Sequence, residues 1–224
     1  MKDFLIVPKN GESASPEHFA SGILPDLESL YASIRPFLQD KRPFLYLCST
    51  EKGEGSSTIA RALAYFIAMR EGEDCLYVDG NSSHPSITIS PDMPQLGLVE
   101  YLRGEDDFRL FPFSTEFPGL SAVHCGEAHR HFVSLNADRA RAFRDAATRD
   151  YRAVIFDSKP GYDRYSEMWA GLADSVMIVA SYRSTKSAIL NRMTDGFRTA
   201  GIPMTGLIFN KRQYPIPEFI YRRV

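Results

Sequence analysis

Beyond Pro43 the sequence alternates between two kinds of segment. Short runs of apolar, β-branched and aromatic residues are separated by longer segments in which apolar residues recur at helical spacing. Near-continuous apolar strands joined by helices are typical of a parallel sheet that is covered on both faces. The sequence therefore predicts an α/β fold with a doubly wound, mainly parallel sheet flanked by helices. We expect strands at 44–48, 75–79, 120–124, 153–157, 175–180 and 206–210, and helices at 57–70, 97–103, 136–149 and 185–200.

The length of 224 residues fits one domain with short extensions. Residues 1–26 mix prolines, glycines and polar residues, and predict an extended N-terminal arm. Residues 27–38 have apolar residues at the i, i+3, i+7 spacing of an amphipathic helix, with Pro36 as a candidate early end. We expect the folded domain to cover 27–212 and a C-terminal tail to cover 213–224.

Composition excludes several classes of protein. A net charge of -2, from 26 Lys+Arg and 28 Asp+Glu, does not support a nucleic-acid binder. An apolar share of 44% excludes bulk disorder. No apolar stretch is long enough for a signal peptide or a membrane span, so we expect a cytoplasmic protein. Three widely spaced cysteines without a C-x-x-C pattern predict buried thiols rather than disulfides or a zinc site: Cys48, Cys75 and Cys125.

A glycine-rich segment follows the first expected strand. Ser49 to Thr58 reads S-T-E-K-G-E-G-S-S-T and leads into the first helix after it. Glycines at such a turn let backbone N–H groups point into one cavity at a helix N-terminus, which favours a phosphate group. By itself the segment is weak evidence, because a minority of such loops are simply tight turns that end in an N-cap serine or threonine, here Ser57 or Thr58. The candidate phosphate-binding residues are Gly53, Glu54, Gly55, Ser56, Ser57 and Thr58.

Polar residues end three other expected strands. Asp79 and Asp157 each close an apolar run, and a carboxylate at this edge of a sheet can hold Mg²⁺ or one of its waters beside a nucleotide phosphate. A single terminal Asp would more often be a cap or turn residue, but two behind a glycine-rich loop favour a site. Asn210 ends the last strand with an amide that can pair with a base.

Together these segments resemble the bacterial tyrosine kinases (BY-kinases) of capsule and exopolysaccharide synthesis, which are relatives of the chromosome-partitioning and division-site ATPases. Ser49–Thr58 resembles their P-loop S-P-E-P-G-E-G-K-S-T. The stretch 79–85, D-G-N-S-S-H-P, is similar to their D-A-D-L-R-R-P, and 157–160, D-S-K-P, to their D-T-P-P. The likeness covers roughly 43–212. It implies a three-layer P-loop NTPase fold that binds ATP or ADP with Mg²⁺.

The resemblance also implies roles for individual residues. Asp79 and Asp157 would be catalytic, and Asn210 would bind the base. Mg²⁺ would be held by Ser57, Asp79 and Asp157. The family phosphorylates tyrosines in its C-terminal tail, and the matching candidates here are Tyr214 and Tyr221.

The sequence departs from the family at charged positions. Ser56 stands in place of the P-loop lysine, and Asn81 in place of the second aspartate of the second motif. The lysine grips the β/γ-phosphates, so its loss is expected to weaken catalysis more than binding. Lys52 is the best candidate for a substitute cation, with Lys159 and Arg183 as weaker ones.

These observations predict a cytoplasmic BY-kinase-like protein of polysaccharide synthesis that is a pseudokinase with weak or no ATP turnover. The resemblance implies a partner, the cytoplasmic tail of a membrane chain-length determinant (a polysaccharide co-polymerase), which would hold the chain at the membrane surface. A competent kinase paralogue is a second expected partner. Two alternatives stay open: an active protein-tyrosine autokinase, and a regulatory scaffold that binds no nucleotide. A partitioning-type ATPase is disfavoured by Ser56.

Overall fold

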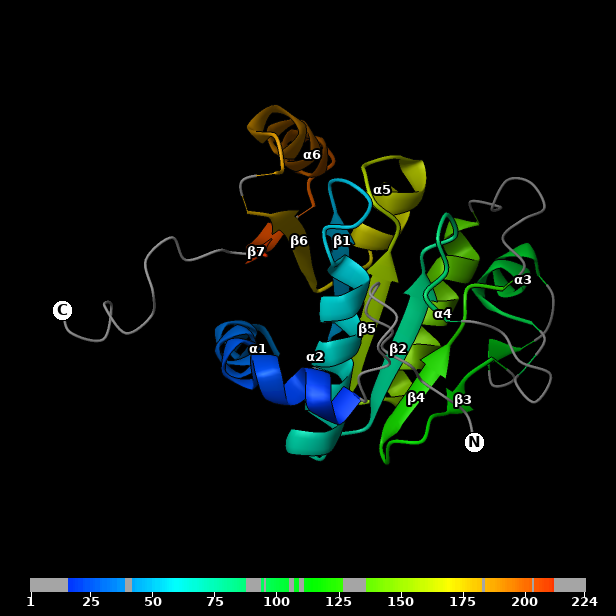
Figure 1. The fold of residues 1–224 in the computed structure, drawn as a ribbon. Helices are drawn as coiled ribbons and strands as arrows, with labels where there is room; N and C mark the ends of the chain where they lie inside the picture. Colours follow the sequence, from blue (N-terminus) through cyan, green and yellow to red (C-terminus); the bar gives the residue numbers. More distant parts are fainter. Residues whose placement is uncertain are drawn as a thin grey trace, which may run out of the picture.

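A computed structural model describes most of the chain, with side chains from residue 25 onward. The described residues are 16–38, 42–87, 94, 96–104, 107–108, 111–126, 136–182, 184–202 and 204–211. They form a seven-stranded sheet with the order β3-β4-β2-β5-β1-β6-β7 and helices on both faces (Figure 1). The strands are β1 (Phe44–Ser49), β2 (Cys75–Gly80), β3 (Phe113–Ser114), β4 (Leu120–Val123), β5 (Ala153–Ser158), β6 (Ser175–Ser181) and β7 (Met204–Asn210). The helices are α1 (Pro16–Leu38), α2 (Ser56–Arg70), α3 (Leu98–Arg103), α4 (Ala137–Asp150), α5 (Arg164–Ala170) and α6 (Ser187–Thr199).

The sheet is parallel except at one edge, where β3 pairs with β4 in the antiparallel direction. Every residue of β1, β2, β5 and β6 is buried, as near-continuous apolar runs predict for strands covered on both faces. The predicted doubly wound α/β fold is therefore confirmed. The short strand β3 was not expected from the sequence.

Two apolar cores lie on opposite faces of the sheet. The core under α4, α5 and α6 is rich in aromatic residues, and Trp169 at its centre stacks on Phe44 and lies 4.4 Å from the Phe156 ring. The core under α2 consists mainly of aliphatic and alanine side chains. Burial of these side chains at about 25 cal/mol per Å² is the main force that holds the layers together.

Helix α1 begins at Pro16, so residues 16–26 are helical rather than an extended arm, and Pro36 does not end the helix. Proline is well tolerated in the first turn of a helix. Further along, α1 packs on α2, where the Tyr31 and Phe66 rings lie 5.4 Å apart. This contact lies within 27–38, the stretch whose apolar spacing predicted a helix. None of the helices in the described part of the chain is long and apolar enough to cross a membrane.

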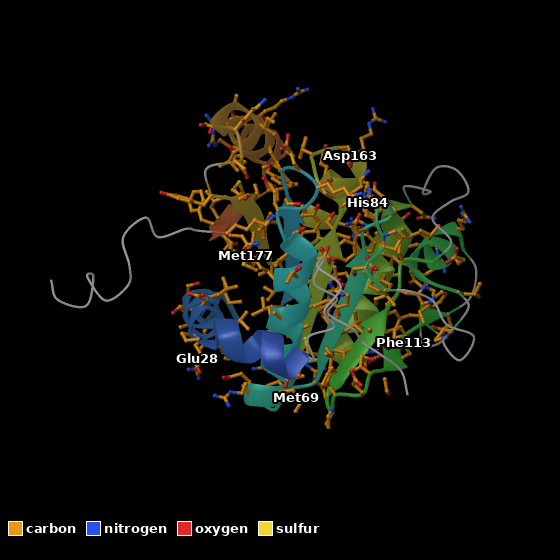
Figure 2. All side chains as sticks on the ribbon, viewed as in Figure 1. Glu28, Met69, His84, Phe113, Asp163 and Met177 are labelled. Carbon is orange, nitrogen blue, oxygen red and sulfur yellow. The ribbon has the colours of Figure 1, made fainter. Side chains whose placement is uncertain are left out.

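The parallel strand order brings the carboxyl ends of β1, β2 and β5 to one end of the molecule. Register pairs Asp79 with Asp157, and Leu47 with Asp157, so β5 lies between the other two strands. Figure 2 shows His84 and Asp163, which follow β2 and β5, at the end of the view opposite Met69. Loops at this end are therefore the place where a ligand site is expected.

Candidate functional site

The loop between β1 and α2 has the backbone geometry of a phosphate cradle. Gly53 and Gly55 have φ values of 88° and 98°, which glycine adopts at low cost. Gly55 is the N-cap of α2, and among the described residues no side chain caps that helix end. The first N–H groups of a helix lack partners within it, so they remain as donors for an anion. The loop at 53–58 thus has a backbone conformation that suits an anion, and its binding of phosphate stays a prediction.

The end of β7 supports this loop from outside. The Asn210 amide Nδ2 donates a hydrogen bond to the carbonyl of Glu54 at 2.8 Å, and Lys211 Nζ donates to the carbonyl of Gly53 at 2.6 Å. A Cβ at Gly55 would lie only 2.2 Å from Asn210 Nδ2, so the contact requires glycine. The structure therefore places Asn210 against the loop backbone, and its expected contact with a base stays a prediction.

The side chain of Glu54 turns into the protein rather than toward the cradle. Its carboxylate accepts hydrogen bonds from the amides of Thr50 at 2.7 Å and Glu51 at 2.9 Å, and from the hydroxyls of Thr50 and Thr185. Burial raises the pKa of Glu54, but these hydrogen bonds outweigh it, and the net shift is downward. An ionised carboxylate therefore holds the first half of the loop.

At the position of the family lysine, the Ser56 side chain is buried. Its hydroxyl donates to Ser49 Oγ at 3.2 Å, so it faces the interior instead of the cradle. Ser57 and Thr58, the next two residues, are partly buried at the start of α2. The loop thus offers main-chain donors without the cation that accompanies them in the family pattern.

Asp79 holds the loop that follows β2. One carboxylate oxygen accepts from the amides of Ser86 at 2.6 Å and Ile87 at 2.9 Å, and the other from the amide of Asn81 at 3.2 Å. Burial raises the pKa of Asp79, while these amide donors oppose the shift. Both oxygens are therefore engaged by the chain itself.

Asp157 lies beside Asp79 and is fully buried. Its Oδ2 accepts from the Tyr77 hydroxyl at 2.8 Å, whereas its Oδ1 has no hydrogen-bond partner among the described residues. Burial and the charge of Asp79 raise the pKa of Asp157 to about 7, while the hydroxyls of Ser57 and Tyr77 oppose this rise. A buried oxygen without a partner beside a second carboxylate has a strong electrostatic demand for a cation or a donor.

The predicted Mg²⁺ ligands fit in part. Asp157 Oδ1 has no hydrogen-bond partner among the described residues, and the Ser57 hydroxyl is near enough to lower the pKa of Asp157. Asp79 Oδ2 accepts two amide hydrogen bonds, while its Oδ1 accepts one at 3.2 Å and can accept more. Mg²⁺ commonly takes one or two protein ligands and completes its shell with water and phosphate oxygens. No group of three or more His, Cys, Asp or Glu side chains in the described ranges could hold a metal without such help.

Of the three predicted substitute cations, the structure describes Lys52 and Lys159. Lys52 lies at the exposed outside of the loop. Lys159 forms an ion pair with Asp163 and lies 5.3 Å from the centre of the Tyr165 ring. Arg183 lies outside the described residues, as do the tail tyrosines Tyr214 and Tyr221.

Two basic residues near the site were missed by sequence reasoning. Lys211 contacts the loop as described above, and Arg61 is buried one helical turn after Ser57. A signal for each was present: Lys211 directly follows Asn210 in the family-like motif, and Arg61 stands at i+4 from an expected metal ligand. The free cysteines are buried, as predicted: Cys48, Cys75 and Cys125.

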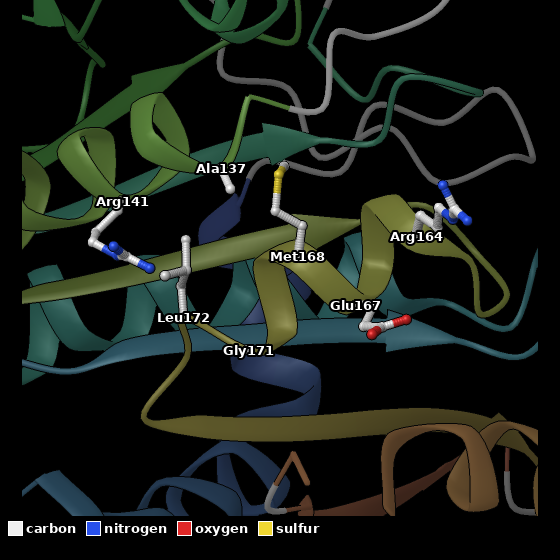
Figure 3. Close-up of a pocket in the computed structure, with 7 residues that line it drawn as sticks. All are labelled: Ala137, Arg141, Arg164, Glu167, Met168, Gly171 and Leu172. Carbon is white, nitrogen blue, oxygen red and sulfur yellow. The ribbon is translucent and has the colours of Figure 1, made fainter. Parts of the chain in front are cut away.

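A hollow of about 420 Å³ lies elsewhere, between α4 and α5. Figure 3 shows Arg141 beside Leu172 on one side, and Glu167 and Arg164 toward the other. None of the residues that line the hollow belongs to the predicted nucleotide site. The phosphate cradle and this hollow are therefore separate features.

Comparison with solved structures identifies the class of fold. The kinase domain of the Escherichia coli tyrosine kinase ETK superposes with a TM-score of 0.74 at 18% identity, over 93% of this chain and 81% of that one. The chimerical protein CapA2B2 gives a TM-score of 0.70 at 20% identity, over 96% and 93%. The septum site-determining protein MinD from Pyrococcus horikoshii OT3, complexed with Mg-ADP, gives 0.62 at 14% identity, over 81% and 76%.

The chain therefore has the P-loop ATPase fold. More narrowly, its structural neighbours include BY-kinase domains and MinD-like ATPases, which confirms at the level of the fold the resemblance drawn from the sequence. No model of a known protein family matches the sequence, and no curated protein matches it at a significant level.

Proposed function

We propose that the chain is a BY-kinase-like protein that binds ATP or ADP in the cradle between β1 and α2 and turns it over weakly or not at all. One observation carries this proposal: Ser56 replaces the family lysine and is hydrogen-bonded to Ser49 in the interior. The main-chain donors and helix terminus that bind phosphate are retained. Binding is therefore expected to survive better than transfer of the γ-phosphate.

Mg²⁺, when bound, would neutralise charge on the β- and γ-phosphates. The residues that would hold it are Ser57 and Asp157, whose Oδ1 has no other partner among the described residues. Asp79 shapes the loop that follows β2 and thereby fixes the wall of the site. In an active kinase of this family Asp79 would accept a tyrosine proton, but here three amide donors hold its two oxygens.

A regulatory scaffold that binds no nucleotide is the second candidate. It is favoured by Glu54, whose buried carboxylate and four donors hold the loop in shape without any ligand. In both cases we infer a role in capsule or exopolysaccharide synthesis at the inner face of the plasma membrane. The partner would be the cytoplasmic tail of a chain-length determinant, or a competent kinase paralogue.

Two measurements separate these functions. ADP and ATP are titrated into the protein by calorimetry with millimolar Mg²⁺, and labelled ATP is then incubated with the protein alone and with the partner tail. Binding without label supports the pseudokinase. If ADP and ATP release no heat on titration and do not raise the melting temperature, the regulatory scaffold is the remaining function. Label on Tyr214 or Tyr221 that is lost in Asp79→Asn would instead establish an active kinase.

A further inference from the structure

The Tyr77 hydroxyl lies between the loop that follows β2 and the carboxylate of Asp157. Tyr77 is fully buried within β2, and its hydroxyl donates to Asp157 Oδ2 at 2.8 Å. The same hydroxyl oxygen lies 2.7 Å from Ser86 Oγ in the loop. These two contacts connect a buried carboxylate of the candidate site to a half-buried residue of the loop that follows the strand.

Strand geometry explains why Tyr77 reaches this carboxylate. Side chains on a strand alternate between the two faces of a sheet, so Tyr77 and Asp79 lie on the same face. This is the face that α2 covers, because Tyr77 belongs to the core under that helix. Tyr77 pairs with Ile155 and Asp79 with Asp157, so Asp157 stands two residues further along β5 than the partner of Tyr77. The length of the phenol side chain bridges this offset.

The hydroxyl hydrogens define the direction of these contacts. A tyrosine hydroxyl has one hydrogen, and an ionised carboxylate only accepts. Since the Tyr77 hydrogen goes to Asp157, the contact with Ser86 requires the Ser86 hydroxyl to donate to the Tyr77 oxygen. The Ser86 amide donates to Asp79 Oδ2 at 2.6 Å. Ser86 thus contacts one aspartate directly and the other through Tyr77.

The two oxygens of Asp157 are consequently unequal. Oδ2 accepts from Tyr77, whereas Oδ1 is buried without a hydrogen-bond partner among the described residues. Carboxylates that ligate a metal are commonly held in turn by hydrogen bonds from neighbouring groups, which orient them. A donor fixed on one side opposes rotation of the carboxylate, which would exchange the two oxygens. The contact therefore leaves Oδ1 as the oxygen available to a cation.

We propose that the Ser86–Tyr77 hydroxyl pair is the positioning element of the Mg²⁺ site, which holds Asp157 Oδ2 so that Oδ1 is presented to the cation. The inference rests on the proposed binding of nucleotide with Mg²⁺ and deepens it. Tyr77 acts through Asp157, so it is a positioning residue and not a catalytic one. Because Ser86 belongs to the loop after β2, the orientation of Asp157 depends on the position of that loop.

The test measures how much Mg²⁺ strengthens ADP binding. ADP is titrated by calorimetry into the full-length protein with millimolar Mg²⁺ and with EDTA, and the ratio of the two dissociation constants is the Mg²⁺ dependence. We expect a ratio of at least about tenfold for the wild-type protein. Tyr77→Phe should reduce the ratio to about threefold or less and leave the value in EDTA nearly unchanged. Ser86→Ala should reduce it less, because Tyr77 keeps its own hydrogen bond to Asp157.

Tyr46→Phe is the matched control. Tyr46 is a fully buried strand tyrosine on the other face of the sheet, and its hydroxyl donates to Ser158 Oγ at 2.8 Å. Loss of this hydroxyl should lower the melting temperature and leave the Mg²⁺ dependence unchanged. The double variant of Tyr77→Phe and Asp157→Asn should have the same ratio as Asp157→Asn alone, because Tyr77 acts through that carboxylate. Additive losses, or an equal loss in Tyr46→Phe, would overturn the positioning role.

A second readout measures the metal directly. Mn²⁺, which suits the same oxygen ligands as Mg²⁺, is titrated into the ADP-bound protein and followed by electron paramagnetic resonance. Its dissociation constant should rise by about tenfold in Tyr77→Phe and stay unchanged in Tyr46→Phe. A constant that does not change in Tyr77→Phe would contradict the proposal.

The outcomes separate this inference from the proposed function. Equal ratios in the wild-type protein and Tyr77→Phe would overturn the role of Tyr77 and leave nucleotide binding intact. ADP binding that does not depend on Mg²⁺ in the wild-type protein would overturn the metal site and its positioning element together. Absence of ADP binding under both conditions would overturn both proposals. If Tyr77→Phe does not fold, Ser86→Ala decides, and an unchanged ratio in that variant would overturn the inference.

Discussion

Glu54 and Thr185 are 131 positions apart in the chain, yet the Thr185 hydroxyl donates to the Glu54 carboxylate. The same hydroxyl accepts from the amide of Ser181 at 2.8 Å, so the contact links the end of β6 to the phosphate loop. We expect Thr185→Val and Glu54→Gln each to lower the free energy of unfolding by about 1–3 kcal/mol, because buried amide donors lose their acceptors. Urea denaturation of the two variants and the double variant measures this.

The double variant should lose less than the sum of the single losses, with a coupling of about 0.5–3 kcal/mol. Ser187→Ala, an exposed substitution close by, is the control and should be near neutral. Strict additivity would show that the contact contributes nothing to the folded state.

Restoring a lysine at position 56 should strengthen nucleotide binding. A charge-assisted hydrogen bond to phosphate contributes about 1.5–3 kcal/mol, so Ser56→Lys should tighten ATP binding by at least about tenfold. Ser56→Met adds similar length without charge and separates electrostatics from shape. Equal affinities of the two variants in a calorimetric titration would mean that the cradle does not place phosphate next to residue 56.

The two neighbouring aspartates should respond in opposite directions to neutralisation. Asp79→Asn should lower the free energy of unfolding by about 1–3 kcal/mol, because both oxygens of Asp79 accept backbone hydrogen bonds. Asp157→Asn should raise it by about 0.5–2 kcal/mol at neutral pH, because it removes one of two adjacent buried charges. Thermal melts of the ligand-free proteins report both, and a loss of stability in Asp157→Asn would contradict the charge argument.

Gly80 is required by close packing rather than by backbone conformation. A Cβ there would lie 2.3 Å from the ring of Phe156, in a region with no room to relax. Gly80→Ala should therefore destabilise the protein by about 1–3 kcal/mol. Gly206→Ala, where the added methyl meets nothing within 4 Å, should change stability by less than about 0.5 kcal/mol. Similar unfolding midpoints for the two variants would show that β2 and the Phe156 ring of β5 can move apart at little cost.

His124 should make stability depend on pH in the mildly acidic range. Its Nε2 lies 2.7 Å from the Pro94 carbonyl, and its Nδ1 accepts from the amide of Gly126, which defines a neutral tautomer. Burial lowers the pKa of His124, although Pro94 and Glu100 oppose the shift. The unfolded chain therefore takes up a proton at higher pH than the folded one, so stability should fall as the pH drops below about 6.5.

The slope from this one group is at most about 1.4 kcal/mol per pH unit. His124→Asn keeps an acceptor for the Gly126 amide and should remove this slope, while the exposed His84→Asn should retain it. Denaturation curves recorded between pH 5 and 7.5 measure how steeply the free energy of unfolding changes with pH in each variant. An unchanged slope in His124→Asn would assign the acid sensitivity to other groups.

Most of the sheet could be predicted because its inner strands carry their own signal. The runs at 44–48 and 153–157 differ from β1 and β5 by one residue at the end, since continuous apolar sequence marks strands buried on both faces. Strand β3 has only two residues and depends on pairing with β4, so no local sequence pattern predicts it. Helix α1 begins at Pro16, well before the amphipathic pattern at 27–38, because the prolines and glycines of 16–26 argued against a helix there.

The arrangement of the candidate site could be predicted where it depends on the backbone, but not where side chains from distant segments meet. Glycines mark the cradle, and parallel register makes Asp79 and Asp157 neighbours. The inward direction of the Glu54 side chain depends on its hydrogen bond with Thr185. The position of the Arg61 side chain depends on its burial. Neither follows from spacing within one segment, because each is decided by contacts between elements far apart in the chain.

The two hydrogen bonds from Asn210 and Lys211 to the loop have a practical consequence for making this protein. A truncated version that ends within β7 would omit both donors and leave the Glu54 and Gly53 carbonyls facing water. Ligand screening on such a fragment would then report on a distorted loop. A truncated protein that keeps the native loop must therefore end after residue 211.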